Sequence, residues 1–151
     1  MMEQNEALEK IYKTAKVVGY ILFASLFFYA GIVEFISRRP EIAGKTIVDF
    51  DPVMLKKIFL VLSVVVYIIC LYIKKYFLRK ASLGGSQAIS SLYISSVSVL
   101  MICQVPAALG LVLYFSAGTK QDFYGLLAVS ALLFVIFFPR FPEWKKVFKI
   151  K

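Results

Sequence analysis

Residues 86–118 read SQAISSLYISSVSVLMICQVPAALGLVLYFSAG, and this stretch decides the fold. It carries no charged side chain, and at about 1.5 Å per residue a helix of this length exceeds a bilayer core of roughly 30 Å. Gln104, Pro106 and Gly110 lie near its middle. Because Pro106 has no N–H to donate, it interrupts helical hydrogen bonding. We therefore predict a membrane-spanning helix over 88–117 that is kinked near Pro106.

Three further apolar segments predict transmembrane helices at about 17–36, 54–76 and 121–138. Hydrophobic residues make up 60% of the chain, against roughly 45–50% in a soluble domain. The sequence thus predicts an all-α fold, an integral membrane four-helix bundle of two hairpins. Residues 1–151 form a single transmembrane domain in this interpretation.

Helix start and stop signals lie between these segments. Asp51 followed by Pro52 is typical of a helix start, with Asp as the N-cap and Pro at the first helical position. Gly118 favours a helix end. Thr119 and Asp122 then have the spacing of a capping box. The third and fourth spans are therefore expected to form a tight hairpin.

The basic residues indicate an orientation. The N-terminal segment, the 74–80 connector and the C-terminal tail hold twice as many Lys and Arg as the 37–57 segment and Lys120 together. The positive-inside rule then predicts that both termini are cytoplasmic. We expect a multi-pass protein of the plasma membrane, the inner membrane of a bacterium. The 37–51 loop faces outward in this topology.

The C-terminal residues 143–151 predict a basic amphipathic tail. Trp144 and its apolar neighbours alternate with lysines, a pattern that suits the surface of a lipid bilayer. The tail should contact anionic headgroups through Lys145, Lys146, Lys149 and Lys151. Because topology and lipid explain the net charge of +9, nucleic acid is not an expected partner.

Several kinds of chemistry have no candidate residues. The chain has no histidine, which removes the usual general base and the commonest metal ligand. Its two cysteines, Cys70 and Cys103, lie in separate apolar runs and are interpreted as buried structural thiols. We expect no metal site, no cofactor and no catalytic constellation, so the protein is not expected to be an enzyme.

Glu34 is the one acid of the first span. An acid at membrane depth is often an ion or proton ligand. The alternative is an interfacial acid that reaches water or pairs with Arg38 one turn later. The second interpretation is favoured because Glu34 lies two residues from the end of the span.

Gln104, Pro106 and Gly110 form the candidate binding site, for helix packing or for contact with a partner. Pro106 deprives the Ile102 carbonyl of its helical donor. The Gln104 carboxamide needs hydrogen-bond partners on a neighbouring helix or on the opened backbone. We therefore expect a polar latch at a kink.

The segment 104–112, QVPAALGLV, resembles the ion-binding helix of rotary ATPase proteolipids, in which a carboxylate precedes a similar apolar run and a Gly-Leu-Val. Gln104 stands at the carboxylate position and cannot titrate. The C-terminal half, with QVPAALGLVLYF, DFY and FPR, is similar to small four-span bacterial membrane proteins, a likeness that implies no activity.

The sequence leaves three functions open. The protein is a non-catalytic accessory or scaffold subunit of a larger membrane complex, a small ion or solute transport (proteolipid-like) protein, or a membrane enzyme. The first is favoured, with other membrane subunits or a second copy as partners. It agrees best with the small residues that recur along one face of a predicted helix, which favour close helix packing, and with the lack of catalytic residues.

Overall fold

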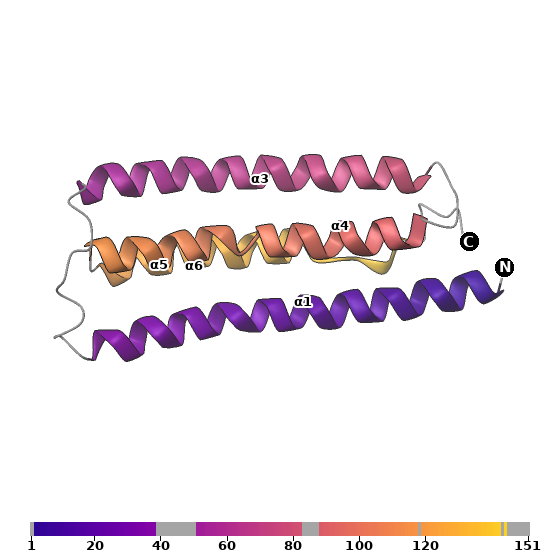
Figure 1. Ribbon diagram of the computed structural model, residues 1–151, viewed down its shortest axis with the longest axis horizontal. Coiled ribbons are helices and arrows are strands. Elements are labelled where there is room, and N and C mark those ends of the chain that lie inside the picture. Colours follow the sequence, from indigo (N-terminus) through magenta and orange to yellow (C-terminus); the bar gives the residue numbers. More distant parts are fainter. Residues whose placement is uncertain (1, 39–50, 83–87, 118, 143, 145–151) are drawn as a thin grey trace.

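The computed structural model describes residues 2–38, 51–82, 88–117, 119–142 and 144, which form helices and no strand (Figure 1). The helices are α1 (Met2–Ser37), α3 (Pro52–Ser82), α4 (Ala88–Ile102), α5 (Val105–Ala117) and α6 (Lys120–Phe137). The all-α prediction is confirmed for these residues.

Four helical segments are long and apolar enough to cross a membrane: Glu6–Ser37, Val53–Arg79, Ala88–Ser116 and Lys120–Phe137. They overlap the four predicted spans, with shifted ends. The first helix begins well before the span expected at 17–36, so its N-terminal turns extend beyond the apolar segment. The described residues therefore contain four candidate spans, which indicates a membrane protein.

The third span is the centre of the bundle. It consists of α4 followed by α5, and α1 and α3 flank it on opposite sides (Figure 1). The fourth span, α6, packs mainly on α5 and also touches α1, α3 and α4. Because α1 and α3 are separated by the other spans, the expected arrangement of two packed hairpins is not confirmed.

Three apolar clusters make up the core. The central cluster joins all four spans through Leu26, Val66, Cys70, Val99, Leu100, Cys103, Ala107, Leu133, Phe134 and Phe137. One end of the bundle is closed by Leu8, Ala15, Ala88, Leu92 and Trp144, and the other by Val33, Tyr114 and Phe123. In a bilayer such contacts are favoured by close packing, because lipid tails are as apolar as the side chains.

The outer surface of the spans is broadly apolar. In the most apolar part of each span, the buried share of the residues is 39% for the third span, 33% for the fourth and 17% for each of the first two. The first and second spans are thus equally exposed, and both are more exposed than the third and fourth. Large side chains on these outer faces, such as Phe28, Val61 and Leu132, suit contact with lipid.

The helix starts agree only in part with expectation. The Asp51 cap is confirmed, because Asp51 Oδ1 accepts the Val53 N–H at 3.0 Å. Thr119 precedes α6 but makes no side-chain cap bond, and its hydroxyl donates to Asp122 Oδ2 at 2.9 Å. The capping box is therefore replaced by a bond between the two side chains. Gly118 and residues 39–50 lie outside the described residues.

The predicted basic tail is described only at Trp144. This indole is 3% exposed and packs with Leu8, Ala15 and Leu92 at the end of the bundle. The ring is thus buried between α1 and α4, whereas the sequence pattern predicted that Trp144 lies at the membrane surface. Lys145, Lys146, Lys149 and Lys151 lie outside the described part of the chain.

Candidate functional site

The third span is interrupted at Cys103 and Gln104, which form a turn between α4 and α5. The Gln104 N–H donates to the Met101 carbonyl at 3.1 Å, a bond one residue shorter than that of an α-helix. The Ala108 N–H then resumes the α-helical pattern by donating to the Gln104 carbonyl at 3.1 Å. Pro106 is fully buried in the first turn of α5, where its missing N–H is tolerated.

The Gln104 side chain links the third span to α1. Its Nε2 donates to the Leu22 carbonyl at 3.0 Å and to Ser25 Oγ at 2.7 Å. The Ser25 hydroxyl in turn donates to the Leu22 carbonyl at 2.6 Å. Both amide hydrogens therefore have acceptors on one neighbouring helix. The latch expected from sequence is present, and its partner Ser25 is a residue that the sequence did not single out.

The opposite side of the turn is held by α6. The buried Ser130 hydroxyl donates to the Cys103 carbonyl. Pro106 was expected to leave the Ile102 carbonyl in need of a donor. The carbonyl that accepts the bond from α6 is instead that of the next residue, Cys103. Among the described residues, every buried side-chain nitrogen or oxygen has a hydrogen-bond partner. The buried side-chain polar atoms of the described residues are thus paired within the chain.

Gly110 allows α5 and α6 to approach closely. A Cβ at this position would lie 3.1 Å from the Leu126 Cβ and 3.2 Å from the Phe123 carbonyl oxygen. Both atoms belong to α6, and the carbonyl can move only with its helix. Gly110 therefore acts in packing between the third and fourth spans.

The two thiols meet inside the bundle. Cys70 Sγ lies 3.9 Å from Cys103 Sγ and 3.9 Å from the Val99 carbonyl oxygen, and both side chains are fully buried. They are free thiols. Within the described ranges, no group of three His, Cys, Asp or Glu residues could hold a metal ion. The pair therefore packs α3 against the third span.

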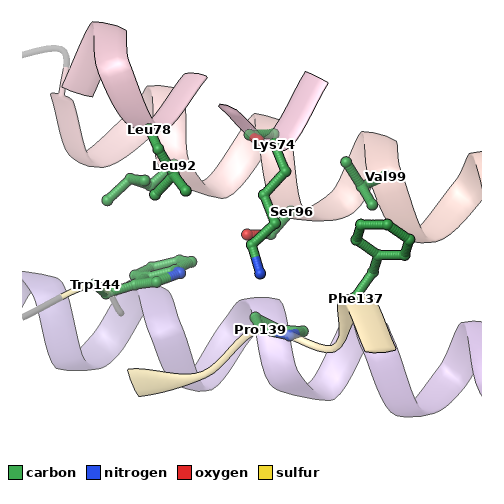
Figure 2. Close-up of a pocket in the computed structure, with 9 residues that line it drawn as sticks. Lys74, Leu78, Leu92, Ser96, Val99, Phe137, Pro139 and Trp144 are labelled. Atoms are coloured by element: carbon green, nitrogen blue, oxygen red, sulfur yellow. The ribbon is translucent and has the colours of Figure 1, made fainter. Parts of the chain in front are cut away.

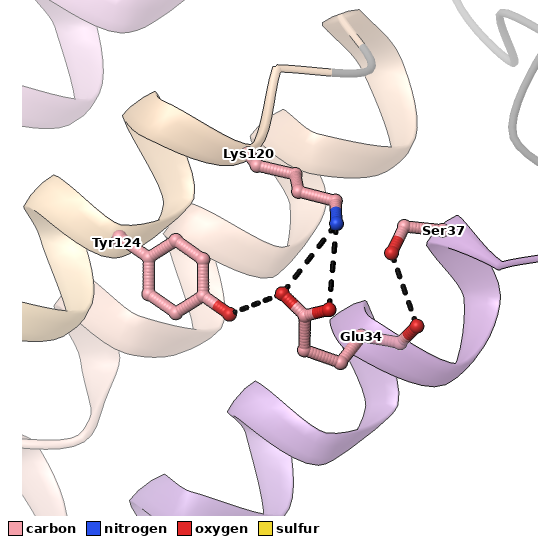
Figure 3. A network of polar contacts seen from close by, with 4 residues as sticks. All are labelled: Glu34, Ser37, Lys120 and Tyr124. Carbon is pink, nitrogen blue, oxygen red and sulfur yellow. Dashed lines mark hydrogen bonds and ion pairs between the residues drawn. The ribbon is translucent and has the colours of Figure 1, made fainter.

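Glu34 has partners other than the one expected (Figure 3). Tyr124 donates its hydroxyl to Glu34 Oε1 at 2.8 Å, and Lys120 Nζ lies 3.4 Å from Oε2. Both partners come from α6, and in the described residues the salt bridge of Glu34 is with Lys120 rather than with Arg38. The Glu34 side chain is 46% exposed, so this is a surface contact between α1 and α6.

A second ion pair lies at the same end of the bundle. Lys56 on α3 pairs with Asp122 on α6, which also accepts the Thr119 hydroxyl. Together with the Glu34–Lys120 pair, it ties α1 and α3 to the beginning of α6. These charges therefore join the helices at one end of the bundle.

Near the other end, a small cavity lies beneath Trp144 (Figure 2). Lys74, Ser95, Ser96 and Trp144 are among its lining residues, with Phe137 and Pro139. Its volume of about 20 Å³ holds a water molecule but no organic substrate. Tyr12 closes this end of the bundle by donating its hydroxyl to the Pro139 carbonyl at 3.3 Å.

No protein-family model, curated protein or solved structure matches this chain. The resemblance of residues 104–112 to rotary ATPase proteolipids therefore remains a prediction. The hydrogen bonds of Gln104 and Ser130 support close packing of four helices around the turn between α4 and α5.

Proposed function

We propose that this protein is a non-catalytic integral membrane protein, an accessory or scaffold subunit of a larger membrane complex. The supporting observation is the set of interhelical hydrogen bonds at the centre of the third span. Gln104 is bonded to α1 and Ser130 to the Cys103 carbonyl, so these groups hold helices together. A site for chemistry needs polar groups directed at a substrate.

The outer face of α6 supports a partner in the membrane. Gly125 and Ala128 are exposed there, and a Cβ at Gly125 would have no atom within 4 Å. Gly110 shows how closely helices approach over such a residue in this fold. A transmembrane helix of another subunit, or of a second copy, would pack closely over Gly125 and Ala128.

Co-purification tests this proposal. The protein is extracted from its own cells in mild detergent, and the mass and composition of the complex are measured. Gly125→Leu should release the partner, whereas Gly31→Leu, an equally open glycine on α1, should retain it. A wild-type protein that migrates as a single chain with lipid and detergent only would contradict the proposal.

The finer features of the fold belong to the same proposal. The third span bends near Pro106, because the turn at Cys103 and Gln104 interrupts its hydrogen bonds. Both termini face the cytoplasm, in agreement with the charge distribution. Cysteine placed at Gln121 should react with an impermeant thiol reagent outside intact cells, and cysteine at Lys75 should not. The reverse labelling would contradict this orientation.

The alternative is a small transport or proteolipid-like protein. Glu34 favours it, because this acid lies within a candidate span and remains accessible. However, Tyr124 and Lys120 engage its carboxylate, and the amide donors of Gln104 are occupied by α1. The accessory role therefore remains the better-supported proposal.

A further inference from the structure

A groove runs along the outside of the bundle between α1 and α6. It is lined by Tyr20, Phe23, Phe134, Val135, Phe138 and Arg140 and has a volume of about 390 Å³. Ligand sites commonly have volumes of roughly 300–1,000 Å³. Of the described residues that line this groove, Arg140 alone is charged. The lining thus combines a long apolar part with one cationic end.

The shape of the groove is set by close packing beneath it. A Cβ at Gly19 would lie 3.0 Å from Phe138 Cε2, so the missing side chain lets this ring lie against α1. The ring centroids of Tyr20 and Phe138 are 5.3 Å apart, and Phe23 meets Phe134 edge to face at 5.8 Å. These contacts hold the aromatic walls in place without a ligand.

The cationic end of the groove has a second basic residue nearby. Lys16 Nζ lies 5.7 Å from the centre of the Tyr20 ring, one turn before the groove on α1. Arg140 is exposed just beyond the end of α6. Tyrosine beside Lys and Arg at the end of a span is typical of the membrane–water interface. The basic end therefore lies at headgroup level, and the aromatic part lies beside lipid tails.

We propose that this groove binds one anionic phospholipid, with an acyl chain along its aromatic walls and its phosphate at Arg140 and Lys16. A guanidinium can bind a phosphate with two parallel hydrogen bonds. Basic pockets between transmembrane helices are suited to anionic headgroups. A partner helix is a poorer occupant, because Tyr20, Val135 and Phe138 are bulky where close helix packing requires small residues.

A second groove provides a comparison within the same molecule. It lies between α1 and α4, has a volume of about 490 Å³ and is lined by Ile11, Thr14, Ser90, Tyr93 and Ile94. None of these lining residues is charged. This groove can accept a lipid chain but has no group that distinguishes an anionic headgroup from a zwitterionic one. Of these two grooves, only the α1–α6 groove should therefore select anionic lipid.

Native mass spectrometry of the full-length, delipidated protein tests the proposal. The probes are phosphatidylglycerol and phosphatidylcholine with identical acyl chains. The wild type should retain one phosphatidylglycerol in preference to phosphatidylcholine. Arg140→Gln should lower the affinity for phosphatidylglycerol about tenfold, the loss expected for a hydrogen bond to a charged group. Lys75→Gln, at an exposed cation outside the groove, should leave it unchanged.

The apolar part of the groove is tested separately. Val135→Trp fills the groove while keeping its charge, and it should abolish the preferential binding. Ile94→Trp fills the uncharged groove and should preserve it. Soluble glycerol phosphate should not displace the lipid at equal concentration. Equal retention of the two lipids, an Arg140→Gln protein that behaves like Lys75→Gln, or displacement by glycerol phosphate would overturn the proposal.

Discussion

Adding a single methyl group to Gly110 tests the packing of the third span against the fourth. In Gly110→Ala the new Cβ lies 3.1 Å from the Leu126 Cβ, 3.2 Å from the Phe123 carbonyl oxygen and 3.4 Å from Phe123 Cδ2. Overpacking of this kind costs about 1–3 kcal/mol. Alanine also stabilises a helix interior by roughly 0.5–1 kcal/mol relative to glycine. We therefore expect a net destabilisation of about 1 kcal/mol.

Gly125→Ala is the matched control on α6. Its Cβ meets no atom within 4 Å, so only the gain in helix propensity of about 0.5–1 kcal/mol remains. The difference between the two variants isolates the steric clash. Unfolding by sodium dodecyl sulfate in mixed micelles can be followed through the fluorescence of Trp144, the one tryptophan, which is buried. If Gly110→Ala stabilised the protein as much as Gly125→Ala, the close approach of α5 and α6 would be refuted.

The remaining predictions use the same unfolding measurement or thiol labelling. Gln104→Leu should destabilise the protein by about 1 kcal/mol, because interhelical hydrogen bonds in membranes average ~0.6 kcal/mol and two are lost; an unchanged unfolding curve would contradict the latch. Ser130→Ala should cost about 1–3 kcal/mol, since it leaves the buried Cys103 carbonyl without this donor; a more stable variant would contradict that role. A thiol reagent should modify Cys70 and Cys103 only after unfolding, because both are fully buried, and labelling of the folded protein would show that the bundle opens.

The spans were predictable because length and apolar composition suffice to identify a helix that crosses a bilayer. An interruption of the third span near Pro106 was also readable, since a proline inside a helix removes the N–H that the preceding turn would bond. The N-cap at Asp51 depends on residues two positions apart and was predicted for the same reason. These features are local, and no knowledge of neighbouring helices is needed to infer them.

Contacts between helices could not be predicted in this way. Ser25 is one of several small polar residues in the spans, and only the rotation of α1 against the third span selects it as the partner of Gln104. For Glu34 the sequence suggested access to water or a pair with its helical neighbour Arg38, and only the packing of α6 brings Tyr124 and Lys120 to it. Trp144 was similarly placed at the membrane surface, although the end of the bundle holds a site for its ring.

Proton flux across liposomes that contain the pure protein tests most directly whether it holds a complex together or transports ions. Gln104 is neutral with both amide hydrogens bonded to α1, and Glu34 is engaged by Tyr124 and Lys120 at a helix end. The accessory role therefore predicts flux equal to that of protein-free liposomes, and the same flux for Glu34→Gln. Flux well above that of empty liposomes, and lost in Glu34→Gln, would contradict the account and favour a transporter.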